Sequence, residues 1–141
     1  MAQNLNSNVT LNPIGINLPI TRGNNGYFNQ TFDSVSQTKI NIFNLLNTKR
    51  GERRFQPYFG SGLESMLFEQ NLDGNTDILK QIITDDIKTW IPNVDVINVD
   101  LAMSDDDKNQ LKDIYKVYIK VTFAVNNTVD SVDLILQKNR I

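Results

Sequence analysis

The spacing of apolar residues divides the 141-residue chain into three parts, and the first part, residues 1–32, has the spacing of extended backbone. Apolar residues occupy alternate positions from Ile14 to Ile20, and the segment is rich in Asn and contains two prolines. Alternation is typical of strands, whereas Asn and Pro disfavour helix interiors. We therefore predict an extended arm closed by a turn at residues 23–26, with a disordered tail as the alternative for residues 1–12.

The second part, residues 33–92, has helical spacing. Ser34 and Gln37 stand at the spacing of a capping box, so a first helix is predicted to begin at Asp33 or Ser34 and to end near Asn47. The residues that share its apolar face are Val35, Ile42, Phe43 and Leu46.

Two further helices are predicted in the same part. Ser61 and Glu64 again have capping-box spacing, which predicts a short helix over about residues 61–69. After an Asp-Gly turn at residues 73–74, apolar residues recur every three or four positions until Pro92, which predicts the strongest helix of the chain. Its apolar positions are Ile78, Leu79, Ile82, Ile83, Ile87, Trp90 and Ile91.

In the third part, residues 93–141, the period changes to two. Apolar residues alternate over residues 94–101, and a one-residue slip at 96–97 predicts a β-bulge. An acidic loop is predicted at residues 104–109, and the clearest strand covers residues 117–125. Asn126 and Asn127 then form a predicted hairpin turn into a last strand from Val129 to Gln137.

These elements predict an α+β fold. It consists of an extended N-terminal arm and about three helices packed on a C-terminal antiparallel three-stranded sheet, whose apolar face the helices cover. The length and the absence of internal repeats predict one domain over residues 1–141, in which residues 1–32 are the arm, 33–92 the helical part and 93–141 the β part.

Composition excludes several functional classes. The chain has no Cys and no His, so disulfides, thiolate nucleophiles, Cys/His metal sites and His-based triads are excluded, and no cofactor is expected. With 14 basic and 16 acidic residues, the formal charge of -2 provides no positive field for nucleic acid. No apolar run has the roughly 18 residues of a membrane span, and residues 1–10 do not have the pattern of a signal peptide.

The most informative stretch runs from Leu45 to Glu69 and reads LLNTKRGERRFQPYFGSGLESMLFE. It combines a leucine-rich helix end, a Thr, then Gly-Glu-Arg, Pro-x-Phe-Gly and Leu-x-x-x-Leu-Phe-Glu, in one order over 25 residues. This signature closely resembles that of the phage baseplate wedge and sheath-initiator family, which includes lysozyme-like-named proteins and is shared with type VI secretion baseplates. The residues that carry the resemblance are Thr48, Gly51, Glu52, Arg53, Pro57, Phe59, Gly60, Leu63, Leu67, Phe68 and Glu69.

The resemblance implies a structural protein of a contractile tail. It predicts a wedge subunit that initiates tail-sheath polymerisation, present in six copies in the baseplate of a virion whose tail is assembled in the host cytoplasm. The predicted partners are other wedge proteins, the tail sheath subunit and the tail tube, but neither nucleic acid nor a membrane. The sequence leaves open whether the tail belongs to a bacteriophage, a tailocin or a secretion system.

One departure from the family pattern concerns the end of the third predicted helix. Many members carry Glu-Pro-Arg there, which is thought to dock onto the helical core of the wedge, whereas this chain reads Trp90-Ile91-Pro92-Asn93 and keeps only the proline. An aromatic or hydrogen-bonded contact would have to replace the charged one, although a Trp at helical spacing is more often a core residue.

Three arginines lie close together in the signature. They predict a contact with an acidic neighbour, and the alternative is a solvated loop whose charges pair with each other. Together with the end of the third helix, they give the predicted wedge interface, which consists of Arg50, Arg53, Arg54, Trp90, Pro92 and Asn93.

The last strand is the predicted contact for the tail sheath. A free strand edge offers unpaired backbone groups to which a sheath arm can add as an extra strand. Val132, Leu134 and Leu136 are expected to face the core, and the alternative is an internal strand with both edges covered. The predicted sheath-strand residues are Val129, Ser131, Val132, Asp133, Leu134, Ile135 and Leu136.

Two other functions compete with this interpretation. A lysozyme-like glycosidase would need paired carboxylates from among Glu52, Glu64, Glu69 and Asp73. Glu52 lies among arginines rather than in the apolar pocket that a general acid needs, and each of the others has a simpler explanation in a helix end or turn, so no enzyme is expected. A free-standing adaptor that binds one partner peptide would use the same surfaces as a ring subunit and differs from it in stoichiometry.

Overall fold

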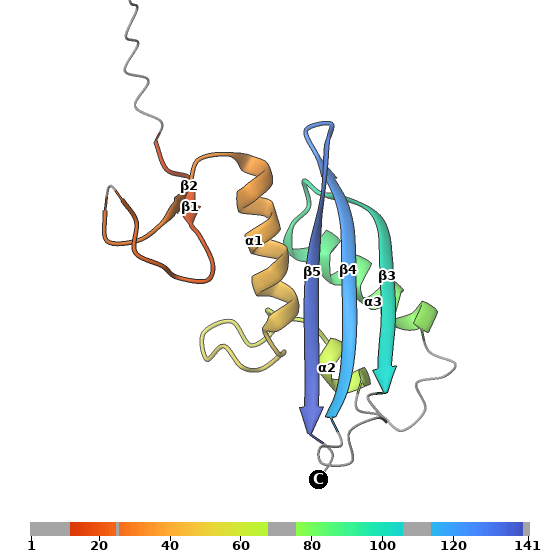
Figure 1. The fold of residues 1–141 in the computed structure, drawn as a ribbon. Helices are drawn as coiled ribbons and strands as arrows, with labels where there is room; N and C mark the ends of the chain where they lie inside the picture. The colour runs from red at the N-terminus through yellow and green to blue at the C-terminus, as the bar shows by residue number, and fades with distance from the viewer. Residues whose placement is uncertain (1–11, 25, 68–75, 106–113, 140–141) are drawn as a thin grey trace, which may run out of the picture.

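The C-terminal third of the chain forms one three-stranded antiparallel sheet. The computed structural model describes residues 12–24, 26–67, 76–105 and 114–139. The sheet consists of β3 (Asp95–Asp105), β4 (Ile114–Val125) and β5 (Thr128–Asn139), in the order β3-β4-β5 (Figure 1). The predicted α+β fold and the predicted sheet are confirmed.

The hairpin between β4 and β5 turns at the predicted pair of asparagines. Asn126 and Asn127 have φ angles of 49° and 62°. Positive φ at both central residues defines the type I′ turn, whose twist matches that of the two strands it joins. The β4–β5 register then runs without interruption from Val125↔Thr128 to Ile114↔Asn139.

The other strand pair is irregular. The β3–β4 register shifts between Val96 and Asn98, which confirms the predicted bulge. As a result Ile97 is exposed and Val99 is buried. The predicted loop at 104–109 begins too early, because Ser104 and Asp105 still pair with β4, and its remaining residues lie outside the described part of the chain.

Alternate side chains of the sheet form the centre of the core. The buried residues of β4 are Val117, Ile119, Val121, Phe123 and Val125. Val132 and Leu134 of β5 continue the same layer, and Leu136 packs against it partly buried, as predicted. Full burial of one such side chain contributes roughly 1.5–3 kcal/mol, so this layer is a main source of folding stability.

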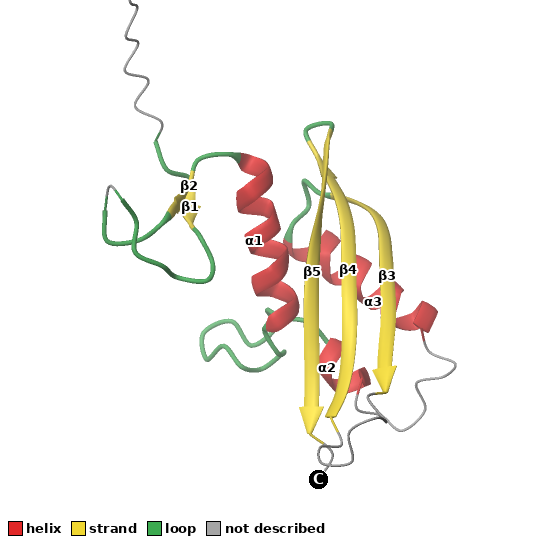
Figure 2. Cartoon of the chain, viewed as in Figure 1, coloured by secondary structure: helices red, strands yellow, loops and turns green. Residues whose placement is uncertain are grey.

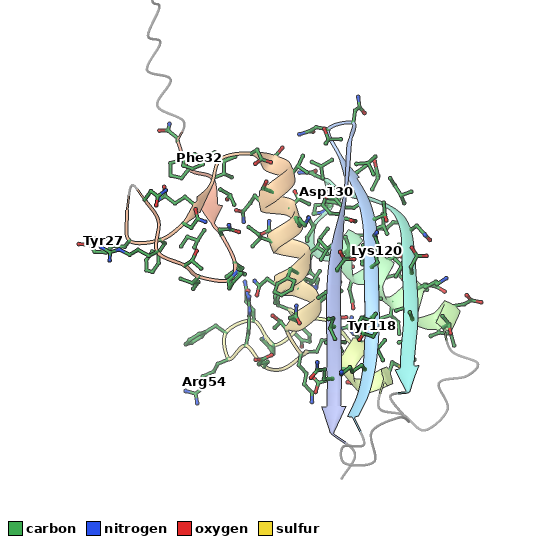
Figure 3. The ribbon with its side chains drawn as sticks, in the orientation of Figure 1. Tyr27, Phe32, Arg54, Tyr118, Lys120 and Asp130 are labelled. Atoms are coloured by element: carbon green, nitrogen blue, oxygen red, sulfur yellow. The ribbon has the colours of Figure 1, made fainter. Side chains whose placement is uncertain are left out.

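Two helices cover this face of the sheet. Helix α1 (Ser34–Asn47) packs against β5, and helix α3 (Thr76–Trp90) packs against β3 and lies behind the sheet in Figure 2. Both ranges agree with the predicted helices. The core residues of the helices are Ile42, Leu45, Leu46, Leu79, Ile83 and Ile87. The opposite face of the sheet carries exposed residues such as Tyr118 and Lys120 (Figure 3).

The start of α1 differs from the capping box that its sequence predicts. Asp33 is the N-cap, and its carboxylate accepts the Ser36 N–H at 2.8 Å. Gln37 cannot complete a box with Ser34, because its side-chain amide accepts from Thr31 Oγ1 and donates to Asn41 Oδ1 at 2.9 Å. The side chain of Gln37 therefore ties the helix to the arm that precedes it.

Helix α2 (Leu63–Leu67) is shorter than predicted within the described residues. Ser61 Oγ accepts the Leu63 N–H at 3.2 Å, which is one half of a capping interaction. The second half is missing, because Glu64 pairs with Lys49 at 3.8 Å instead. The predicted turn at 73–74 lies outside the described residues.

The arm is extended, as predicted, and makes a small sheet of its own. Strand β1 (Gly15–Ile16) pairs antiparallel with β2 (Gln30–Thr31), and the Asn29 N–H donates to the Thr21 carbonyl at 2.9 Å. The alternation from Ile14 to Ile20 does not give a long strand, because these isoleucines are exposed and none of the described segments forms a layer over them. Most of the segment 1–12 lies outside the described residues.

Three residues of the predicted apolar helix faces are not core residues. The exposed fraction is 41% for Phe43, 47% for Ile78 and 37% for Trp90, because each side chain lies at the border of the face that meets the sheet. The interpretation of Trp90 as a core residue is therefore wrong. Within the described residues, no helix has both the length and the apolarity that a membrane span requires.

Candidate functional site

Most of the signature residues lie in the loop 48–62, which joins the C-terminus of α1 to α2, and Leu63 and Leu67 lie in α2 itself. Thr48 ends α1, and its hydroxyl donates to the Asn44 carbonyl at 2.6 Å. The Thr48 carbonyl accepts the Ser61 N–H at 2.8 Å, which closes the loop at its base. Gly60 lies against this contact with φ +120°, and an added Cβ would be 2.5 Å from the Thr48 oxygen. Only glycine fits at this position.

Backbone hydrogen bonds inside the loop fix the shape of its tip. Gly51, with φ +87°, donates its N–H to the Pro57 carbonyl at 2.8 Å. The Glu52 carboxylate accepts the Lys49 N–H at 3.0 Å, and the Phe59 N–H donates to the Gln56 carbonyl at 3.0 Å. The positive φ of Gly51 and the fixed φ of Pro57 thus account for two signature positions by local geometry.

A buried carboxylate holds the base of the loop to α3. The Asp86 side chain is 5% exposed and forms an ion pair with the Arg50 guanidinium. Its second oxygen accepts from Ser61 Oγ at 2.9 Å and from the Gly62 N–H at 3.4 Å. Because every polar atom of this carboxylate is bonded, the burial of its charge is compensated.

Arg50 therefore differs from the other two arginines of the predicted basic cluster. Its guanidinium has a partner inside the molecule, and its main role is to hold the loop to α3. Arg53 stacks on the Phe59 ring, with 3.9 Å between Cζ and the ring centroid. Arg54 extends from the tip of the loop away from the body of the protein (Figure 3).

An aromatic pair connects the loop to the end of α3. The Phe59 and Trp90 rings meet edge to face, with their centroids 5.1 Å apart. Trp90 is followed by the exposed turn residues Pro92 and Asn93. Arg53, Phe59 and Trp90 therefore form a stack, the stacked cluster, at the position where the sequence departs from Glu-Pro-Arg. Five of the six predicted wedge-interface residues lie in the loop tip or around this cluster.

The predicted sheath-strand residues lie at one border of the sheet. β5 pairs with β4 on one side, and no described strand pairs with its other side, which we call the β5 margin. In an antiparallel pair, alternate residues of a strand bond to its neighbour and the residues between them turn their backbone groups outward. The Ser131 N–H donates to the Asp130 carboxylate at 2.7 Å rather than to β4, so the outward set consists of every second residue from Val129 to Gln137. Val132 and Leu134 bond to β4 and point into the core.

A groove of about 500 Å³ runs beside the first half of the β5 margin. Helix α1 forms its middle, with Phe43 and Ile40, because α1 lies between the arm and β5 (Figure 1). Residues 17–19 and 30–33 line one side, and Asp130, Val132 and Asp133 of β5 line the other. We call this feature the β5 groove.

Of the carboxylates considered for a glycosidase, the structure describes Glu52 and Glu64, and each already has a partner in Lys49. Glu52 bonds to the loop backbone, and Glu64 is exposed and paired with Lys49. Glu69 lies outside the described residues, as do Phe68 and Asp73. No cluster of acidic residues suited to a metal ion is found in the described ranges.

Sequence reasoning missed Asp86 and the groove. Asp86 follows Ile83 by three positions and Leu79 by seven, so helical periodicity places it on the buried face of α3. A charged residue at a core position of a helix signals an ion-pair partner elsewhere in the chain. The groove has no such signal, because its lining residues are dispersed over the arm, α1 and β5.

Comparison with known proteins relates this arrangement to tail baseplates. Residues 34–129 match the family described as baseplate wedge protein gp25. The baseplate wedge protein gp25 of Enterobacteria phage T4 is 25% identical over 97 residues, which are 69% of this chain and 68% of that protein. A protein of Geobacter sulfurreducens provisionally named as a tail lysozyme has a similar fold, with a TM-score of 0.55 and 19% identity over 76% of this chain and 91% of that chain.

Proposed function

Because the chain belongs to the baseplate wedge protein gp25 family, we propose that it is a structural subunit of a contractile-tail baseplate wedge on which the tail sheath begins to polymerise. Family membership supports the structural role in a phage baseplate, and the T4 relative is named for that role. The finer step, in which a sheath arm adds as a strand to β5, is our proposal. One observation carries it: the β5 margin is regular over its whole length and has no strand partner in the described chain.

The two outer strands of the sheet differ in their suitability for strand addition. β3 has a bulge near its start, a feature by which proteins protect an edge. β5 has twelve residues in unbroken register. An added strand can follow β5 without a change of twist, so β5 is the better template.

Magnitudes indicate that backbone bonding alone does not hold the added strand. Each new backbone hydrogen bond contributes roughly 0.5–1.5 kcal/mol net, and an antiparallel pair forms about one bond per residue. Ordering one residue of a flexible arm costs roughly 1–2 kcal/mol. The two terms nearly cancel, so side chains of the arm must decide affinity and specificity.

A second surface anchors the subunit in the wedge. We assign this contact to the loop tip, which carries Arg54, and to the stacked cluster, in which Arg53 and Trp90 both contact Phe59 and which the exposed Pro92 and Asn93 follow in sequence. Neither Arg53 nor Arg54 forms an ion pair with a carboxylate in the described part of the chain, so an acidic neighbour in the wedge fits here. The Phe59–Trp90 pair supplies an apolar contact in place of Glu-Pro-Arg.

The proposal includes residues 1–141 as one sheath-initiator-like domain, six copies per baseplate, and the tail tube as a further neighbour. It includes no catalytic step. Native mass spectrometry of co-expressed baseplate proteins tests the copy number, since six copies in a ring support a ring subunit. A stable one-to-one complex would instead identify an adaptor.

A proline at the margin tests strand addition directly. Ile135 turns its N–H toward the margin, and its side chain is 54% exposed on the outer face of the sheet. Ile135→Pro therefore removes a margin donor without removing a bond to β4, and Ile135→Thr is the control that keeps the donor. We expect baseplates with Ile135→Pro to start fewer sheaths, counted by electron microscopy, at unchanged baseplate yield.

Truncation after Asn126 is a weaker test, because it also removes the buried residues Val132 and Leu134. Thermal unfolding must first show that both Ile135 variants fold as the parent does. Equal sheath initiation by the two folded variants would mean that the sheath does not bind through the backbone of β5.

A further inference from the structure

The β5 groove lies where an added strand would place its side chains. A strand paired with β5 lies roughly 4.8 Å beyond it, and its side chains point alternately to the two faces of the sheet. On the helix-covered face of the sheet, α1 packs against β5, and its residues Ile40 and Phe43 line the groove. Alternate side chains of the strand would therefore enter the groove.

The groove has unused apolar surface. Phe43 is 41% exposed and Phe32 is 46% exposed. Leu18 and the buried Val132 line the same space. Exposed aromatic groups beside an open strand edge can be covered by an apolar side chain that arrives with the strand.

The charges of the groove are mostly negative. Its lining contains Asp33, Asp130 and Asp133, and Lys39 is its one basic residue. Lys39 pairs with Asp130 at 3.4 Å, and neither Asp33 nor Asp133 forms an ion pair within the described residues. The Ser36 N–H donates to Asp33 and lowers the pKa of that carboxyl, so its negative charge persists to a lower pH than that of an ordinary Asp.

We infer that the β5 groove is the specificity-determining half of the strand-binding site, and that it takes an extended segment with apolar side chains at alternate positions and a Lys or Arg beside them. This inference rests on the proposed strand addition to β5 and adds the chemistry of the partner. The segment belongs to the sheath subunit, which is the chain that the β5 margin is proposed to receive.

Fluorescence anisotropy with synthetic peptides tests the inference on the full-length protein. The probes are labelled twelve-residue peptides, matched to the length of β5, in which alternate positions are Thr and the others are Leu, with one Lys. Sister peptides replace Leu by Gly, Lys by Glu, or alternate backbone N–H groups by N-methyl. The parent is called the Leu/Lys peptide, and a Leu/Gln peptide, in which Gln replaces the Lys, is the uncharged reference. We expect the Leu/Lys peptide to bind most tightly, and we expect added salt to weaken its binding more than the binding of the Leu/Gln peptide.

Phe43→Ser is the test variant, and Phe55→Ser is its matched control. Phe43 lies in the groove, and Phe55 is 95% exposed in the loop 48–62, away from the groove lining. We expect Phe43→Ser to weaken the Leu/Lys peptide about tenfold, which corresponds to about 1.4 kcal/mol, and Phe55→Ser to leave binding unchanged. Equal melting temperatures of the two variants ensure that folding is not the cause.

The outcomes separate this inference from the proposed function. If N-methylation abolishes binding but Phe43→Ser behaves like Phe55→Ser, strand addition stands and the role of the groove is wrong. If Phe43→Ser weakens binding and N-methylation has no effect, the groove binds the peptide without β5, which contradicts the proposed function. A preference for the Glu peptide over the Lys peptide would overturn the assignment of a basic segment.

Discussion

The ion pair between Arg50 and Asp86 makes a prediction about which partner matters more for stability. Arg50→Ala and Asp86→Ala each remove one partner, but the groups they leave behind differ. The Arg50 side chain is 55% exposed, whereas the Asp86 side chain is 5% exposed. A guanidinium without its partner can turn toward water, but a carboxylate in the core cannot, so Arg50→Ala should be the more destabilising change.

The magnitudes follow from the burial of each group. Leaving a buried charge without its partner costs roughly 3–5 kcal/mol, which we expect for Arg50→Ala. Asp86→Ala loses hydrogen bonds to a charged group, with an expected cost of roughly 1.5–3 kcal/mol. For a chain of this length about 1 kcal/mol corresponds to about 4 °C in melting temperature, so Arg50→Ala should unfold at a clearly lower temperature.

Thermal and urea unfolding followed by circular dichroism measure both changes. Asp85→Ala is the control, since Asp85 is the exposed neighbour of Asp86 on the same helix and forms no side-chain ion pair in the described chain. It should change the free energy of unfolding by less than about 0.5 kcal/mol. If Asp86→Ala is as destabilising as Arg50→Ala or more so, the stranded carboxylate is not the dominant cost and the reasoning fails.

Three further predictions concern backbone and capping positions. Gly60→Ala should destabilise by about 2 kcal/mol or more in urea unfolding, because it adds a clash with Thr48 to an unfavourable φ, and Gly51→Ala, which meets no atom within 4 Å, should cost only about 1 kcal/mol. The pKa of Asp33 is lowered below its ordinary value of 3.8, so its N-cap contact stabilises the fold above pH 3.8, and this stabilisation is lost as the pH falls below that value. Asp33→Asn should therefore remove the contribution of Asp33 to the acid dependence of the melting temperature, measured in melting curves at a series of pH values. Asn127→Gly should raise the melting temperature slightly, because glycine adopts the φ of 62° more readily, and a lowered value would contradict the type I′ assignment.

Local patterns in the sequence predicted the main elements well. The strands around Asn126 and Asn127 followed from alternation and a turn pair, and α1 and α3 followed from helical periodicity and their end signals. These signals are local, because strand alternation and helix periodicity arise within a few residues of backbone. The two predicted capping boxes failed because their acceptor residues have other partners. Gln37 bonds to Thr31 and Glu64 pairs with Lys49, and the three-residue spacing of a capping box does not reveal either contact.

The sequence by itself determined the family signature, the fold class and the absence of cysteine and histidine chemistry. The tertiary structure decided which arginine of the signature has an ion-pair partner within the molecule. It also decided that Trp90 is partly exposed and packs against Phe59, and that the arm, α1 and β5 line one groove. The physical reason is distance along the chain. Asp86 lies 36 residues from Arg50, and residues 30 and 130 line one space, so only folding brings their charges and surfaces together.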